Sequence, residues 1–256
     1  MSRALLVFSK APEAGTAKTR LIPALGALGA AQLQQKMTEW VVTEAAASSL
    51  GPVTLCCAPD CNHSTFSELQ QRFKIELQPQ HGEDVGERMH KAIEGTLQLH
   101  DTVILMGSDC PQIDRSLLAT VADTLEQHDV VIVPAEDGGY VLIATRVPVA
   151  TVFQGITWGT DRVMEQTIGV LQQQQLNWYA LPPLVDIDRP EDLQFIPKGW
   201  LDDREANHGR ISRLSGGHVE LLGIYPDRWG DSYVGCALLP SVRVRATGNC
   251  DAFSLL

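Results

Sequence analysis

The chain has 256 residues, 44% of them hydrophobic, which suits one full core with a small appendage rather than two ordinary domains. Its formal net charge of −11 argues against a surface that neutralises nucleic-acid phosphates, because such surfaces depend on clustered Lys and Arg. No apolar run approaches the roughly 20 residues that cross a bilayer, so we expect a cytoplasmic protein without a membrane span.

Short apolar runs bounded by turn residues predict strands, and longer segments with helical spacing lie between them. We expect strands at residues 4–8, 53–57, 102–106, 130–133 and 140–143. We expect helices at residues 24–47, 64–73, 86–99, 116–128 and 160–173. This alternation predicts an α/β domain around a largely parallel sheet.

Capping residues support two of the helix starts. Asp114 precedes the helix expected from residue 116, and Thr160 with Asp161 can cap the last one. After about Gly199 the sequence loses helical and strand periodicity. We therefore expect a catalytic domain over residues 1–198 and an extension over 199–256, either a small β unit or a partly ordered tail.

The six cysteines are read as reduced thiols, since the chain has no secretory leader. Cys56, Cys57, Cys61 and His63 have the side-chain types of a zinc site, but no second cysteine pair at finger-like spacing accompanies them. Buried thiols at the end of an apolar strand are the favoured interpretation.

A basic loop follows the first strand, where ligands of open α/β sheets bind. Gly15 can admit an anion close to the backbone, Arg20 can grip phosphate oxygens in a bidentate way, and Lys10 and Lys18 supply point charges. Lys18 and Thr19 imitate the end of a Walker phosphate loop, but the required glycines are replaced by Ala17 and Pro12. The pattern predicts phosphate binding of another kind, with Thr19 among the phosphate-binding residues.

Three acidic positions point to a hard metal and to proton transfer. Asp109 follows a buried strand in a tight turn, and Mg²⁺ usually takes one or two carboxylates plus phosphate oxygens. Asp188 precedes a proline that can open a helix, so metal binding and helix capping are both open for it. Asp137 precedes Gly138 and Gly139, which would let a substrate pass close to the backbone.

Two further stretches are expected to complete the site. Residues 81–89 follow a strand and open a helix, so the backbone near Gly82, or Arg88, could face a phosphorylated donor. On the acceptor side we place Tyr140 beside the two glycines, and also Trp158, which could stack on a sugar or could belong to the core.

Taken together, four ordered motifs resemble the DUF2064 family, a group of glycosyltransferase-like proteins, some associated with arsenosugar biosynthesis. The motifs are residues 10–21, Gly-Ser-Asp-Cys-Pro at 107–111, Asp-Gly-Gly-Tyr at 137–140, and residues 186–193. The resemblance covers about residues 3–196. It implies the three-layer GT-A fold of nucleotide-diphospho-sugar transferases, which is Rossmann-like, with helices on both faces of a mostly parallel sheet.

By this resemblance, Lys10, Gly15, Lys18 and Arg20 would hold the nucleotide and its phosphates, and Asp109 would be the metal-binding carboxylate. Asp188 would occupy the late acidic position. Gly159 stands where the family commonly has Ser, and Arg189 replaces the usual Thr before proline, departures that bear mainly on the acceptor.

The leading hypothesis is glycosyl transfer from a nucleoside diphosphate sugar to a small-molecule acceptor, with Mg²⁺ or Mn²⁺ on Asp109 and with Asp137 as general base. The first alternative is nucleotidyl transfer, in which a phosphorylated small molecule attacks a nucleoside triphosphate and pyrophosphate leaves. The second alternative is a nucleotide-binding protein without turnover. The same fold supports both transfer chemistries.

Overall fold

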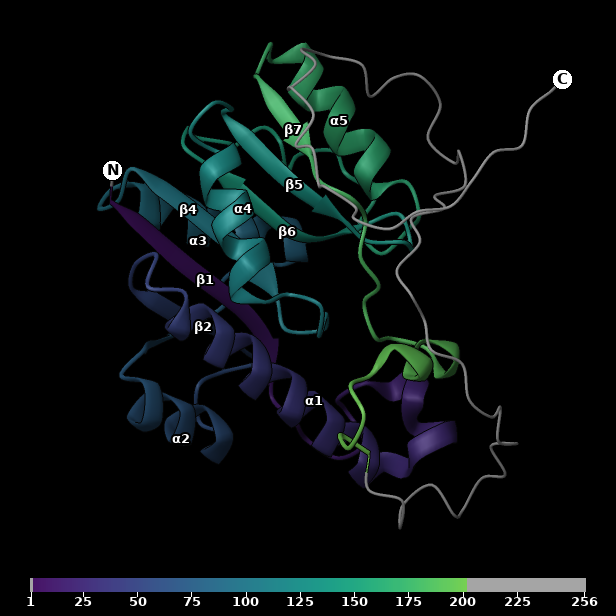
Figure 1. Ribbon diagram of the computed structural model, residues 1–256. Coiled ribbons are helices and arrows are strands. Elements are labelled where there is room, and N and C mark those ends of the chain that lie inside the picture. The colour runs from purple at the N-terminus through teal and green to yellow at the C-terminus, as the bar shows by residue number, and fades with distance from the viewer. Residues whose placement is uncertain (1, 202–256) are drawn as a thin grey trace, which may run out of the picture. The chain divides into compact units, whose positions relative to one another are not determined.

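The computed structural model describes residues 2–201, so most of the extension predicted for residues 199–256 lies outside the described range. Seven strands form one sheet in the order β3-β2-β1-β4-β6-β5-β7 (Figure 1). The strands are β1 (Arg3–Lys10), β2 (Val53–Ala58), β3 (Glu76–Pro79), β4 (Thr102–Gly107), β5 (Val130–Pro134), β6 (Tyr140–Thr145) and β7 (Trp178–Ala180). β6 runs antiparallel to both of its neighbours, and the other strand pairs are parallel. The predicted mostly parallel α/β fold is confirmed.

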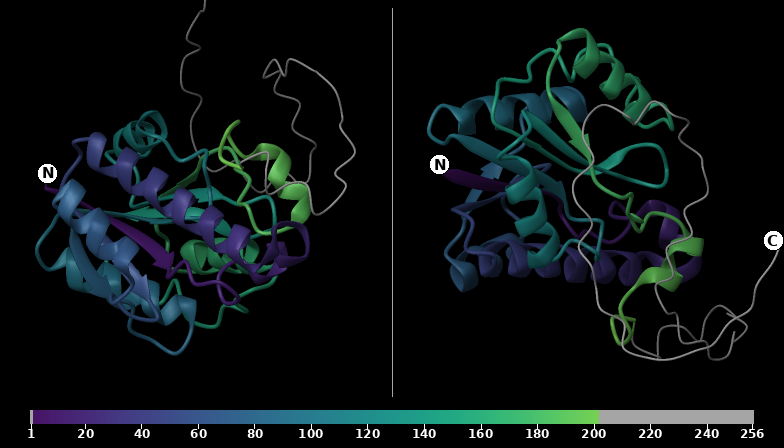
Figure 2. Two further views of the ribbon diagram at one scale, coloured as in Figure 1. Left: turned by 90° about the horizontal axis from the view of Figure 1, so that it is seen from below. Right: turned by 45° about the horizontal axis from the view of Figure 1, so that its top comes forward.

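Helices cover both faces of this sheet because successive strand residues point to opposite sides. In β1, Leu5 and Val7 pack into one buried cluster and Leu6 into another. The first cluster contains residues of α1 (Ile22–Ala47), α2 (Ser64–Phe73) and α4 (Arg115–Thr124), and the second contains residues of α3 (Val85–Leu97) and α5 (Val163–Gln173). The three layers can be followed in Figure 2.

Helix capping agrees with the sequence at one predicted start and differs at two. Asp114 caps α4, where its Oδ1 accepts a hydrogen bond of 2.8 Å from the backbone N–H of Leu117. Thr160 and Asp161 do not cap α5, which has Arg162 at its N-cap. Asp188 is likewise not a cap, because the late 3₁₀ helix η2 (Pro190–Phe195) has Arg189 in that position. The carboxylate of Asp192 accepts hydrogen bonds from the backbone N–H groups of Asp188 and Arg189 instead.

The late segment, residues 184–188, is fixed against the carboxyl edge of the sheet. Leu184 donates its backbone N–H to Pro134, and Ile187 donates to the backbone carbonyl of Asp109 at 2.9 Å. Val185 and Ile187 join a buried cluster with residues of α1 and of the short 3₁₀ helix η1 (Thr19–Leu21), while Asp186 and Asp188 line cavities. The alternation of apolar and acidic residues therefore delivers two carboxylates to the edge where β1 and β4 end.

No helix within residues 2–201 is long and apolar enough to span a membrane.

Ile187→Ala tests this anchoring. Ile187 is fully buried, so its truncation is expected to lower the free energy of unfolding by about 2 to 5 kcal/mol, measured by urea denaturation. A loss below about 1 kcal/mol would contradict the anchoring role. Ile168→Ala, at a partly buried position of α5 on the other side of the sheet, is the comparison and is expected to cost less.

Candidate functional site

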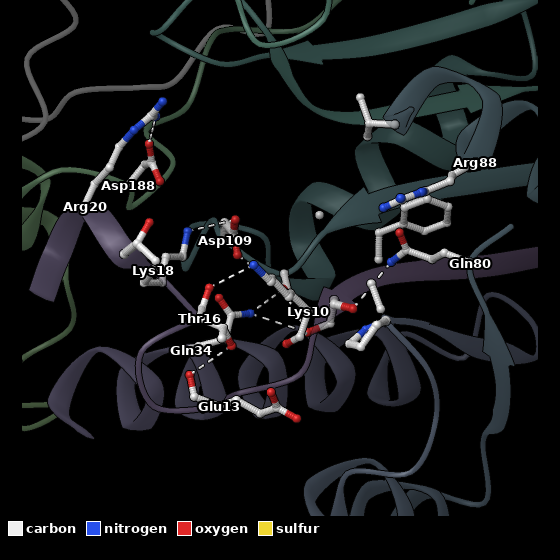
Figure 3. A pocket seen from close by; sticks show the side chains of 18 residues that line it. Lys10, Glu13, Thr16, Lys18, Arg20, Gln34, Gln80, Arg88, Asp109 and Asp188 are labelled. Atoms are coloured by element: carbon white, nitrogen blue, oxygen red, sulfur yellow. Dashed lines mark hydrogen bonds and ion pairs between the residues drawn. The ribbon is translucent and has the colours of Figure 1, made fainter. Parts of the chain in front are cut away.

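A cavity of about 850 Å³ opens at the carboxyl ends of β1 and β4 (Figure 3). The loop after β1 lines one side, α1 lies beneath it, and the start of α3 closes one end. Seven of the predicted site residues line this cavity. They are Lys10, Lys18, Thr19, Arg20, Arg88, Asp109 and Asp188.

One end of the cavity holds two pairs of opposite charges. Lys18 Nζ lies 2.8 Å from Asp109 Oδ2, and the lysine side chain is only 4% exposed. Arg20 pairs with Asp188, and this hydrogen-bonded pairing raises the pKa of the arginine above its usual value. The convergence of cations from the opening loop with carboxylates from later strand ends, on which the sequence hypothesis rested, is present.

The backbone of the opening loop aims these cations. Lys18 adopts a left-handed conformation with φ 46°, and η1 and α1 follow directly. Lys10 Nζ donates to the backbone carbonyl of Thr16 at 2.8 Å, which folds the loop back over the end of β1. Gly15, with φ +90°, makes the turn between them, and it does not line the cavity itself.

Gln80 and Arg88 mark the opposite end of the cavity (Figure 3), and the apolar side chains of Phe8, Pro59 and Val85 also line the cavity. Arg88 Nε donates to the backbone carbonyl of Gly82 at 3.0 Å, so Gly82 positions the guanidinium and does not itself line the cavity. Gln80 Nε2 donates to the backbone carbonyl of Cys56 at 2.8 Å. Apolar surface with fixed polar groups suits a flat, partly polar ligand group.

A second cavity of about 180 Å³ shares Asp109 with the first. Asp137, Gly139, Tyr140 and Asp186 line it as well, so the predicted base lies across Asp109 from the larger cavity. Asp137 Oδ1 accepts a hydrogen bond from the backbone N–H of Gly139 at 2.9 Å. Asp186 was not predicted as a site residue, although its alternation with Asp188 in the sequence was an available signal.

Burial, together with the negative charge of Asp137, raises the pKa of Asp186 from 3.8 to about 6. Lys18 acts in the opposite direction and Asp109 adds to the increase. Around Asp186, the combined effect of burial and of the neighbouring carboxylates therefore outweighs the effect of the positive charge of Lys18.

The donor chemistry of these carboxylates fits a hard divalent cation. No three His, Cys, Asp or Glu side chains within residues 2–201 are arranged to hold a metal ion by themselves. Mg²⁺ characteristically uses one or two protein carboxylates and completes its coordination with phosphate oxygens and water. Asp109 and Asp188, which line one cavity, match that partial requirement.

Two residues predicted on the acceptor side lie outside the small cavity and have packing roles. Trp158 lines a third cavity, of about 280 Å³, together with Asp84 and Glu87. Its ring packs against that of Phe153, with 6.3 Å between the ring centroids, and covers Gly86 at the start of α3. Gly138 has φ +94°, and a Cβ on it would lie 2.2 Å from the carbonyl oxygen of Asp161. Gly139 and Tyr140 do line the small cavity.

The cysteines and histidine weighed as a zinc site do not form one. His63 Nδ1 accepts the backbone N–H of Thr65 at the start of α2. Burial raises the pKa of Cys56 to about 12, as it does for Cys110 in the small cavity, so neither thiol is a ready thiolate.

Comparison with known proteins gives a family and a fold. The family model "Uncharacterized protein conserved in bacteria (DUF2064)" matches residues 41–160. A solved structure called a "putative nucleotide-diphospho-sugar transferase", from Desulfovibrio desulfuricans G20, is 32% identical, with a TM-score of 0.68 over 74% of this chain and 84% of that chain. No curated protein matches the chain significantly.

More distant structures share the fold. One of them is called "A nucleotidyl transferase from Methanothermobacter thermautotroptrophicus". It is 13% identical to this chain, with a TM-score of 0.56 over 78% of this chain and 98% of that chain. A 4-diphosphocytidyl-2C-methyl-D-erythritol synthase from Anaerococcus prevotii DSM 20548 is 10% identical, with a TM-score of 0.53 over 76% and 95%. At these identities the likeness concerns architecture alone.

Asp186→Asn is expected to stabilise the metal-free protein at neutral pH. Because the pKa of Asp186 is higher in the folded state, this group favours folding at low pH, and its contribution is lost as pH rises from about 4 to about 6. In EDTA at pH 7.5 the variant should gain about 2 kcal/mol over wild type, and the gain should vanish near pH 4. A gain that is equal at both pH values would refute the assignment; urea denaturation measures it.

Gly138→Ala is expected to lower the free energy of unfolding by about 2 kcal/mol, because the added Cβ meets the Asp161 backbone at a positive φ. Gly139→Ala is the matched control, since its Cβ would meet only the Asp137 side chain, at 3.2 Å. Equal melting temperatures for the two variants would contradict this account.

Proposed function

The chain belongs to the DUF2064 family of bacterial proteins, and from that premise and its two joined cavities we propose that it is a metal-dependent transferase that uses a nucleotide-activated donor. Glycosyl transfer from a nucleoside diphosphate sugar to a small-molecule acceptor is the reaction we favour. The name of the 32% identical relative, "putative nucleotide-diphospho-sugar transferase", supports this choice. The observation that carries the proposal is the pairing of Lys18 with Asp109 inside the larger cavity.

The larger cavity accommodates the donor along its length. Lys18, Arg20 and Lys10 supply positive charge for the diphosphate, and Arg20 can hold phosphate oxygens in a bidentate way. The nucleobase lies at the other end, beside the polar groups of Gln80 and Arg88, in a cavity that Phe8 and Pro59 line with apolar surface. This orientation brings the sugar toward Asp109 and the small cavity.

Asp109 and Asp188 would hold Mg²⁺ or Mn²⁺, which when bound neutralises the charge that grows on the departing diphosphate. Lys18 and Arg20, which pair with these carboxylates in the ligand-free chain, then contact the phosphate oxygens. Both charges act on the leaving group. The Lys18 side chain is almost fully buried, and electrostatic interactions are stronger where water is excluded.

The small cavity receives the acceptor. An acceptor hydroxyl oxygen bonds to the anomeric carbon as the bond from that carbon to the diphosphate oxygen breaks, and nucleoside diphosphate leaves. Asp137 takes the hydroxyl proton as general base, because one of its oxygens is held by the Gly139 N–H and the other is left for the proton. Asp186 lies in the same cavity.

Asp109→Asn is expected to lower the rate of Mn²⁺-dependent donor hydrolysis by at least about 100-fold, because the carboxylate needed by the metal is lost. Nucleoside diphosphate release is measured with UDP-, GDP- and CDP-sugars, with and without EDTA. Asp123→Asn, at an exposed position of α4, is the matched control and should retain wild-type rates.

Undiminished hydrolysis by Asp109→Asn would contradict the site assignment. Release of pyrophosphate from a nucleoside triphosphate and a phosphorylated small molecule, with no turnover of nucleotide sugars, would replace glycosyl transfer by nucleotidyl transfer. Binding of nucleotides with neither reaction would leave a binding protein without turnover.

A further inference from the structure

Gln34 is a buried polar side chain in the wall of the larger cavity. It belongs to α1, is only 2% exposed, and lines the cavity beside Lys10 and Asp109 (Figure 3). Glutamine is usually a surface residue, and a buried amide requires hydrogen-bond partners for both of its ends. Its surroundings satisfy one end.

Three hydroxyl groups surround the amide nitrogen. Gln34 Nε2 donates to Ser108 Oγ at 3.0 Å, to Thr38 Oγ1 at 3.2 Å and to Ser9 Oγ at 3.4 Å. These three residues are themselves buried, at the ends of β1 and β4 and on α1. The side chain is thus fixed to both central strands of the site.

The hydroxyl groups of Thr38 and Ser108 donate their protons to acceptors other than the Gln34 side chain, and this determines which end of the Gln34 amide faces them. Thr38 Oγ1 donates to the backbone carbonyl of Gln34 at 2.9 Å, so toward the side chain it acts as an acceptor. Ser108 Oγ directs its proton to Ser9 Oγ or to Asp109 Oδ1. An amide nitrogen, rather than an amide oxygen, therefore faces these hydroxyls.

The amide oxygen is left over. Gln34 Oε1 has no hydrogen-bond partner among residues 2–201, although the side chain is almost wholly removed from solvent. A carbonyl oxygen in that position is stabilised when a ligand donates a hydrogen bond to it. The ligand group must carry an O–H or N–H and must lie in the middle of the cavity.

We propose that Gln34 Oε1 accepts a hydrogen bond from a ribose hydroxyl of the nucleotide donor. Gln34 lies between the cationic end, marked by Arg20 and Asp188, and the end marked by Gln80 and Arg88 (Figure 3). In a nucleotide the ribose joins phosphate to base, and its 2′ and 3′ hydroxyls are the donors of that region. The inference rests on the proposed function, since it assumes a nucleotide in this orientation.

The test removes the same hydrogen bond in two ways: by deleting the hydroxyl group from the ligand and by replacing the acceptor side chain in the protein. UDP, GDP, CDP and ADP are titrated calorimetrically with Mn²⁺, and the tightest is compared with its 2′-deoxy and 3′-deoxy forms. Wild type should bind the ribonucleotide about 3- to 10-fold more tightly than at least one deoxy form. Gln34→Met, which keeps the size and removes the acceptor, should abolish that preference, whereas Gln35→Met on the same helix should keep it.

The outcomes separate this inference from the proposed function. If wild type binds none of the four nucleotides, both fall. If it binds ribo and both deoxy forms equally, or if Gln34→Met keeps the wild-type preference, the inference alone is overturned. The wild-type comparison with deoxy ligands needs no variant, so equal binding there overturns the inference even if Gln34→Met does not fold.

Discussion

The contact between Lys18 and Asp109 is the constraint on which the site depends. A lysine with a 4% exposed side chain must keep an anionic partner, because an unpaired charge removed from water is very unfavourable. Asp109 supplies that partner from the end of β4, and it belongs to both cavities. The position of the opening loop, the end of a central strand and the boundary between the two cavities are therefore set by one ion pair.

The fold brings these groups together through strand ends and one anchored segment. β1 and β4 are adjacent and parallel, so the residues that follow them emerge at the same edge. Residues 184–188 return to that edge, where Ile187 donates to the backbone of Asp109 while its side chain is buried. The apolar positions of this segment hold it in place, and the acidic positions between them line the two cavities.

Much of the sheet could be predicted because its central strands are continuous apolar runs, but β3 and β7 are short and polar or only partly buried, so no such run marks them. In the site, the basic loop and Asp109 could be found since their charges cluster in sequence. Gln34 gains its significance from neighbours distant in the chain, which periodicity does not reveal, whereas the alternation of Asp186 with Asp188 was visible in the sequence. For Trp158 and Gly138 the sequence could not separate packing from binding, because an aromatic ring or a glycine has the same sequence signature in both.

The ligand-free cavity carries its own counterions, since its buried lysine and one of its arginines are each matched with a carboxylate. A simple anion gains little there, because it competes with aspartates that are already in place. On the proposed function, an anion that arrives with a divalent cation would meet no such competition, because the cation would occupy the aspartates and the anion would take the released basic groups. The resting charge arrangement would then discriminate against free phosphate.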